Sequence, residues 1–207
     1  MKKETIMVYL LILAGIFLIF NEFRLLGLNN KVSGSGVSDI PTQIKTVSAL
    51  DVSPKGVPEI YGKELGVSYD DISVSNQKKA DETISKLGLF DTKINLEGDL
   101  LKRYIKITNS IGCEYCCGLQ TITTPQGEPA CSCSHSFAMR GLAKYLLTKH
   151  PELSDNQILE ELGKWKTLFF PDAIGAKAAV LKAKGIELNY INLASNKYKD
   201  IEKTGGV

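Results

Sequence analysis

All five cysteines of this chain fall in one short segment, Cys113 to His135, which also holds one of its two histidines. The segment begins Cys-Glu-Tyr-Cys-Cys-Gly and ends Cys-Ser-Cys-Ser-His. Thiols gathered in this way bind a metal ion, pair as disulfides or exchange electrons with other thiols, and each role brings the sulfurs together in space. The chemistry of the protein is therefore predicted to lie in this segment.

The residues between the two cysteine groups predict a β-hairpin. Leu119 to Thr124 is rich in β-branched residues, and Pro125 to Glu128 is typical of a turn. Because a hairpin brings its two ends together, the two cysteine groups are expected to meet. The facing residues would be Cys113, Cys116 and Cys117 on one side, and Cys131, Cys133 and His135 on the other.

The cysteine spacing favours a soft metal ion. Cys113 and Cys116 form a Cys-x2-Cys pair, as in thiolate zinc sites, whereas Cys131-x-Cys133 gives a tighter bite that suits Cu(I). We therefore expect Zn(II) as a structural centre or Cu(I) for storage or transfer, and no organic cofactor. The preferred ligands are Cys113, Cys116, Cys131 and Cys133, with Cys117, His135 and Met139 as substitutes, although ordinary core packing is the simpler role for Met139.

Two other interpretations stay open from the residues alone. A disulfide-stapled interaction module of the cell envelope would pair four of the five cysteines and leave one over. Thiol–disulfide exchange would use Cys113-Glu114-Tyr115-Cys116, although the βαβ pattern that surrounds a thioredoxin-like motif is missing. No catalytic residue is assigned, and the sequence favours a role other than catalysis.

The N-terminal segment predicts attachment to a membrane. Residues 1–4 form a short tail with two lysines, and residues 5–26 are predominantly apolar and long enough to span a bilayer. Lysines before the span favour a cytoplasmic N-terminus and a single-pass protein whose head lies outside the cytoplasm. Residues 27–58, rich in Gly, Ser and Pro, are typical of a tether, and residues 59–207 would form an extracytoplasmic cysteine-rich head domain.

The rest of the chain predicts an α+β head. Asn76 or Ser75 can cap a helix that stops at Gly88, and Ser154 to Gln157 is a capping-box pattern. Lys93–Leu96 and Ile186–Ile191 are interpreted as short strands. The predicted fold class is thus an N-terminal transmembrane helix, a flexible tether and a small head in which the cysteine-bearing hairpin packs on about three to five helices.

The charge pattern limits the expected partners. With a formal net charge of +2 and no stripe of lysine or arginine, nucleic acid is not an expected partner. Arg140 and Lys144 are expected on a solvated helix face. The expected partners are the membrane, through residues 5–26, the metal ion, and an envelope protein or a second copy of the chain.

Two short motifs resemble a known family. Tyr115-Cys116-Cys117-Gly118 and Cys131-Ser132-Cys133-Ser134-His135 are similar to the Pro-Cys-Tyr-Cys-Gly-Cys motif of prokaryotic extracytoplasmic proteins of unknown function. The resemblance covers about 30 residues and lacks the proline and the cysteine order of that motif. It implies an external, membrane-attached, cysteine-rich head and no particular activity.

Overall fold

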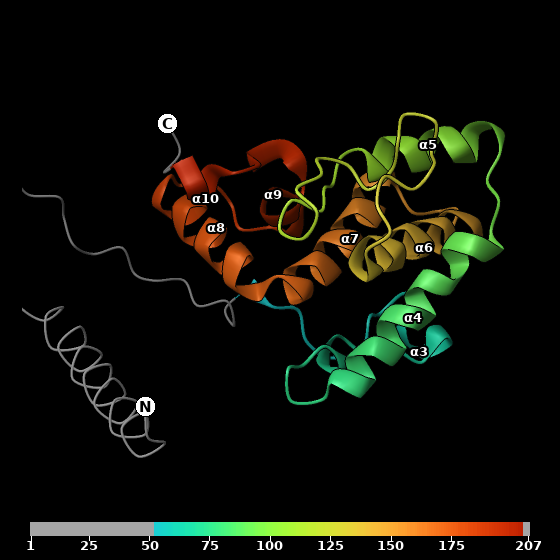
Figure 1. The fold of residues 1–207 in the computed structure, drawn as a ribbon, viewed down its shortest axis with the longest axis horizontal. Coiled ribbons are helices and arrows are strands. Elements are labelled where there is room, and N and C mark those ends of the chain that lie inside the picture. Colours follow the sequence, from blue (N-terminus) through green and yellow to red (C-terminus); the bar gives the residue numbers. More distant parts are fainter. Residues whose placement is uncertain (1–51, 205–207) are drawn as a thin grey trace, which may run out of the picture. The chain divides into compact units, whose positions relative to one another are not determined.

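A computed structural model describes residues 52–204 of the chain (Figure 1). This part contains α3 (Gly62–Leu65), α4 (Gln77–Lys93), α5 (Gly98–Thr108), α6 (Ser134–Lys149), α7 (Asp155–Phe169), α8 (Pro171–Ala183), α9 (Tyr190–Ala194) and α10 (Ile201–Thr204). Two 3-10 helices, η2 (Tyr69–Asp71) and η3 (Asn196–Tyr198), complete it. The long segment between α5 and α6 carries all five cysteines.

The predicted α+β class is wrong, since the described residues form helices and no strand. The segment expected to be a hairpin makes only isolated bridges, including Cys113 with Leu119 and Thr123 with Pro129. Its backbone groups pair partly across the turn, where the Thr124 N–H donates to the Glu128 carbonyl at 2.7 Å and the Ala130 N–H donates to the Ile122 carbonyl at 3.2 Å. Other groups pair with the neighbouring helices. The Ile122 N–H donates to the Thr108 carbonyl of α5 at 3.3 Å, and the Ile122 carbonyl accepts from Arg140 of α6 at 3.4 Å.

The predicted membrane localisation is also corrected. Among residues 52–204, no helix combines the length and the apolar character that crossing a bilayer requires. The longest of these helices, α4, has 17 residues and carries charged side chains such as Lys78, Lys79 and Asp81. The described residues thus contain no span of the kind that the predicted single-pass protein needs. The predicted tail (1–4), the predicted anchor (5–26) and most of the predicted tether (27–58) lie outside the described residues.

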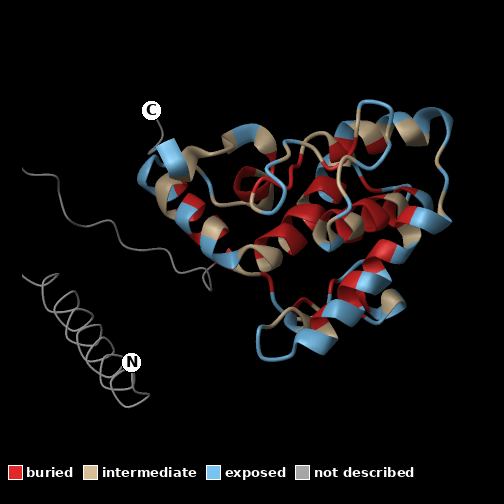
Figure 2. Ribbon diagram, in the orientation of Figure 1, coloured by how far each residue is buried: buried red, intermediate tan, exposed pale blue. Residues whose placement is uncertain are grey.

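The core of the described region lies along α6 and α7. Figure 2 shows the buried residues concentrated on these two helices. Leu142 and Leu146 of α6 and Leu162 and Trp165 of α7 are at most 1% exposed. Burial of these side chains is the main favourable contribution to packing, at about 1.5–3 kcal/mol for each large apolar side chain. The α6–α7 pair therefore forms a rigid base for the cysteine segment, whose last residues lead directly into α6.

Helix α4 packs along α6 through two glycines. A Cβ atom at Gly88 would overlap the Phe137 ring, and one at Gly141 would overlap the Leu87 carbonyl oxygen. The prediction that Gly88 ends the helix is therefore wrong, because α4 continues to Lys93 and uses this glycine for close approach to α6. The predicted N-terminal cap is confirmed, since the Asn76 side chain accepts the Lys79 N–H at 3.2 Å.

In the C-terminal half, α7 and α9 begin at side chains that cap them. The predicted capping box at the start of α7 is confirmed, with Ser154 and Gln157 each accepting the other's backbone N–H. The predicted strand at Ile186–Ile191 is wrong because Asn189 caps α9, accepting the Asn192 N–H at 2.8 Å. The predicted strand at Lys93–Leu96 is likewise absent, because this stretch is the end of α4 and the connection to α5.

Candidate metal centre

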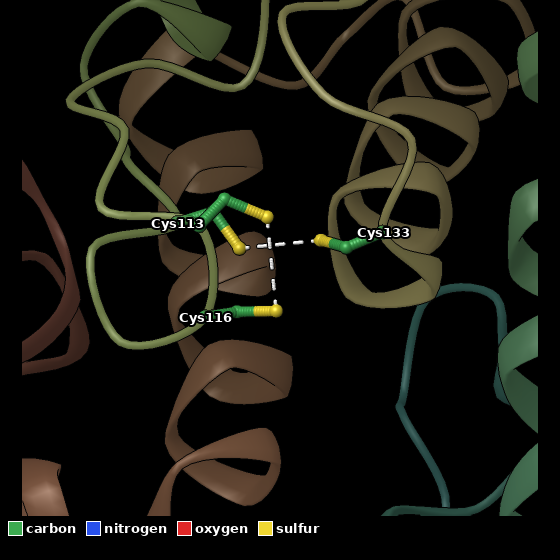
Figure 3. Close-up of side chains that lie close together, drawn as sticks. Cys113, Cys116 and Cys133 are labelled. Atoms are coloured by element: carbon green, nitrogen blue, oxygen red, sulfur yellow. Dashed lines mark hydrogen bonds between the residues drawn. The ribbon is translucent and has the colours of Figure 1, made fainter.

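Four thiol sulfurs converge in the segment between α5 and α6. The Sγ atoms of Cys113, Cys116, Cys117 and Cys133 all lie within 4.8 Å of one another. Figure 3 shows Cys133 reaching across toward Cys113 and Cys116 from the opposite side of the site. A tetrahedral zinc centre with Zn–S bonds of about 2.3 Å holds its sulfurs about 3.8 Å apart. Small side-chain adjustments would therefore bring these four sulfurs around one metal ion.

A tight turn presents the first three cysteines. The backbone N–H groups of Cys116 and Cys117 both donate to the Cys113 carbonyl, at 3.2 and 2.9 Å. The Cys113 N–H donates to the Leu119 carbonyl at 3.0 Å, which closes the turn. Gly118 has φ +70°, a left-handed conformation that glycine adopts without a steric penalty. The turn returns Cys116 and Cys117 to the same side as Cys113.

The start of α6 presents the last two cysteines. Cys133 is the N-cap of α6, and its sulfur accepts the Ser136 N–H at 3.4 Å. The buried Ser136 hydroxyl oxygen lies within hydrogen-bond distance of the sulfurs of Cys131 and Cys133, at 3.1 and 3.3 Å. The Cys131 sulfur lies 3.6 Å from that of Cys133. The N-terminus of α6 therefore favours negative charge on Cys133.

The thiols differ in their affinity for a proton. The sulfurs of Cys113 and Cys133 are 3.3 Å apart. A hydrogen bond between them raises the pKa of Cys113 and lowers the pKa of Cys133. The Cys117 thiol donates to the Cys116 sulfur, which raises the pKa of Cys117 to about 12. A metal ion that binds all of these sulfurs must displace protons, so its affinity is expected to rise with pH.

One side of the cluster faces solvent. Cys113 is buried and Cys133 is partly buried, whereas Cys116 and Cys117 are exposed. All five cysteines lie in the described region and are free thiols there. An ion held at this cluster would thus be reached and released through the Cys116–Cys117 side.

The two non-cysteine candidates take different places. The His135 ring packs against Phe169 and Phe170, with ring centroids at 4.8 and 4.9 Å, and its Nδ1 is buried without a hydrogen-bond partner. His135 lies beside Cys133 and contributes to lowering the pKa of that thiol. Met139 is 1% exposed in the apolar core, which agrees with the packing role considered for it. Neither residue belongs to the four-sulfur group.

Arg140, expected on a solvated face, is a buried support of the site. It is 3% exposed, and its guanidinium donates to Asp91 of α4 at 2.8 Å and to the Cys131 carbonyl at 3.0 Å. Lys144 also contacts Asp91, at 3.1 Å. The expectation of a solvated face is therefore wrong for Arg140, which ties the second cysteine group to both α4 and α6.

The first cysteine group has a buried anchor of its own, which the sequence reasoning missed. Glu114 accepts from the Lys166 ammonium of α7 with both oxygens, at 2.7 and 2.8 Å, and Lys166 also donates to the Ala194 carbonyl. Burial lowers the pKa of Lys166 to about 8, against the opposing effect of Glu114. Lys177 of α8 lies 3.8 Å from the same carboxylate. The one sequence signal was a lysine inside the apolar stripe of α7.

Comparisons of this chain with protein-family models, with curated proteins and with solved structures returned no match. The class of the protein is therefore defined by its own fold and site. In the described region it is a helical protein with a cluster of four cysteines that can hold a metal ion.

Proposed function

We propose that this protein binds a soft metal ion through Cys113, Cys116, Cys117 and Cys133. The observation that supports this proposal most strongly is the convergence of four sulfurs, within 4.8 Å of one another, from two separate segments. The four ligand atoms are all thiol sulfurs, and thiolates select Zn(II), Cu(I) or iron–sulfur clusters over hard cations. The chemistry of the ligand set thus favours Zn(II) or Cu(I).

Two features favour reversible binding over a purely structural ion. Structural zinc sites are closed, four-coordinate centres, whereas Cys116 and Cys117 are exposed here. The helical core also has apolar contacts of its own, since α6 and α7 bury residues such as Leu162 and Trp165. Storage or transfer of the ion is therefore the role that we propose.

Titration of the reduced, metal-free, full-length protein under anaerobic conditions tests this proposal. Co(II) and Zn(II) serve as probes, because Co(II) in a tetrahedral thiolate site gives sulfur-to-metal charge-transfer bands that Zn(II) bleaches by displacement. We expect one equivalent of Co(II) per chain and complete bleaching by one equivalent of Zn(II). Absorption without charge-transfer bands, or binding of only a small fraction of an equivalent, would contradict the proposal.

Thiol–disulfide exchange is the second candidate, and one distance favours it. The 3.3 Å between the sulfurs of Cys113 and Cys133 is short enough for a disulfide to form after a small movement. Exchange predicts a Cys113–Cys133 disulfide in the oxidised protein and turnover of a model disulfide that is lost in Cys133→Ser. Metal binding predicts instead that the loaded protein holds no disulfide and that Cys113, Cys116, Cys117 and Cys133 are alkylated only after the metal is removed.

A further inference from the structure

Cys131 is a fifth sulfur that joins the four-sulfur group. Its Sγ lies 3.6 Å from that of Cys133, and both thiols share the Ser136 hydroxyl. A single tetrahedral ion uses only four sulfurs, so this placement of the fifth one needs another explanation.

The close sulfur pairs link the two cysteine groups. Cys113 lies 3.3 Å from Cys133, Cys133 lies 3.6 Å from Cys131, and Cys116 lies 3.7 Å from Cys117. Five sulfurs this close together can hold several ions if each thiolate bridges two of them. Cu(I), a soft ion, is satisfied by two or three thiolates, so bridging lets a few sulfurs hold several ions. Zn(II), which takes four ligands, would leave the fifth sulfur unused.

The surroundings suit an anionic cluster that exchanges its ions. A thiolate cluster with more sulfurs than Cu(I) ions carries net negative charge. Lys166 of α7 is a buried cation next to the first cysteine group, 2.7 Å from Glu114. The exposed Cys116 and Cys117 provide the side through which ions enter and leave. The buried Lys166 ammonium and the exposed Cys116 and Cys117 thiols are therefore compatible with an anionic cluster that exchanges its ions.

We infer that the five cysteines together bind more than one Cu(I) ion in a single thiolate-bridged cluster. This inference rests on the proposed soft-metal function and specifies its cargo and its capacity. Cys131 is then a ligand of the copper cluster and not of a mononuclear Zn(II) site. The two metals therefore require different sets of cysteines, which makes the inference testable with one substitution.

The test is an anaerobic titration of the reduced full-length protein with Cu(I), added as its acetonitrile complex. Native mass spectrometry counts the bound ions, and competition with a Cu(I) chelator measures their retention. Wild type is expected to reach a stoichiometry above one, in a multi-copper species formed cooperatively. Cys131→Ser is expected to bind fewer Cu(I) ions while still binding one Zn(II). Ser132→Ala, which changes an exposed neighbour, is the matched control and should leave both counts unchanged.

The possible failures are distinguishable. A wild-type protein that binds one Zn(II) but only a single Cu(I), with Cys131→Ser behaving identically, would overturn the cluster and leave the metal site standing. Loss of Zn(II) binding in Cys131→Ser would also overturn the inference, because Cys131 would then be an ordinary ligand of the mononuclear site. Wild type that binds neither ion would overturn the proposed function itself.

Discussion

Replacement of Cys113 by serine is expected to weaken Zn(II) binding at least about a hundred-fold, since even changes outside the ligand set cost metal sites about 10- to 100-fold. Cys113 is the buried member of the four-sulfur group, and its sulfur lies closest to Cys133. A serine hydroxyl is a poor ligand for a soft ion, so the variant keeps three thiolates at most. Competition with a chromophoric chelator at fixed pH measures the change.

The matched control is Cys131→Ser, which removes a neighbouring thiol from outside the four-sulfur group and should leave Zn(II) affinity within about two-fold of wild type. Because Cys113 packs in the apolar core, thermal unfolding of each metal-free variant must show that it folds. Cys133→Ser provides a second test from the α6 side and should lose affinity to a similar extent. Equal affinities in wild type and Cys113→Ser would show that the four sulfurs do not form the site.

Replacement of Arg140 by methionine is expected to destabilise the protein by about 3 kcal/mol, the lower end of the cost of removing one partner from a buried ion pair. Asp91 would keep Lys144, at 3.1 Å, but would lose the shorter and more buried contact to Arg140, at 2.8 Å. The Cys131 carbonyl would lose its donor as well. Chemical denaturation of the metal-free protein, followed by circular dichroism, measures the free energy of unfolding.

Two further variants identify the cause of that loss. Arg140→Met combined with Asp91→Asn removes the stranded carboxylate charge and should recover a large part of the stability. Lys102→Met breaks an exposed pair with Asp99, whose side chains are 78% and 91% exposed, and should cause no measurable change. If the double variant were less stable than Arg140→Met alone, lost packing would explain the effect better than a buried unpaired charge.

The site could be located from the sequence because its ligands are close along the chain. The Cys-x2-Cys spacing requires only a tight turn, which Gly118 permits with φ +70°. The two cysteine groups lie close together as expected, but the segment that joins them is not a regular β-hairpin. The chain turns back on itself with backbone hydrogen bonds from Thr124 to Glu128 and from Ala130 to Ile122, but only isolated bridges form. Ile122 also pairs with Thr108 of α5 and Arg140 of α6, so the β-branched run is held by helices and does not extend into a regular strand. Local β propensity gave way to tertiary hydrogen bonding.

The remaining differences depend on contacts between distant residues. Whether Cys117 or Cys131 joins the four-sulfur group depends on the turn after Cys113 and on the Ser136 hydroxyl, which spacing alone does not reveal. Gly88 looked like a helix stop because its role is a close approach to another helix. Arg140 looked solvated because its partner Asp91 lies 49 positions earlier in the chain. Helix caps such as Ser154 were predictable because all their partners are local.

X-ray absorption at the zinc edge of the Zn(II)-loaded full-length protein tests the four-sulfur site most directly. The account predicts a first shell of about four sulfurs at about 2.3 Å with no nitrogen or oxygen contribution. Cys131→Ser should give the same spectrum, whereas any residual Zn(II) in Cys113→Ser should show fewer sulfurs. A first shell dominated by nitrogen or oxygen, or a sulfur shell unchanged in Cys113→Ser, would contradict the site.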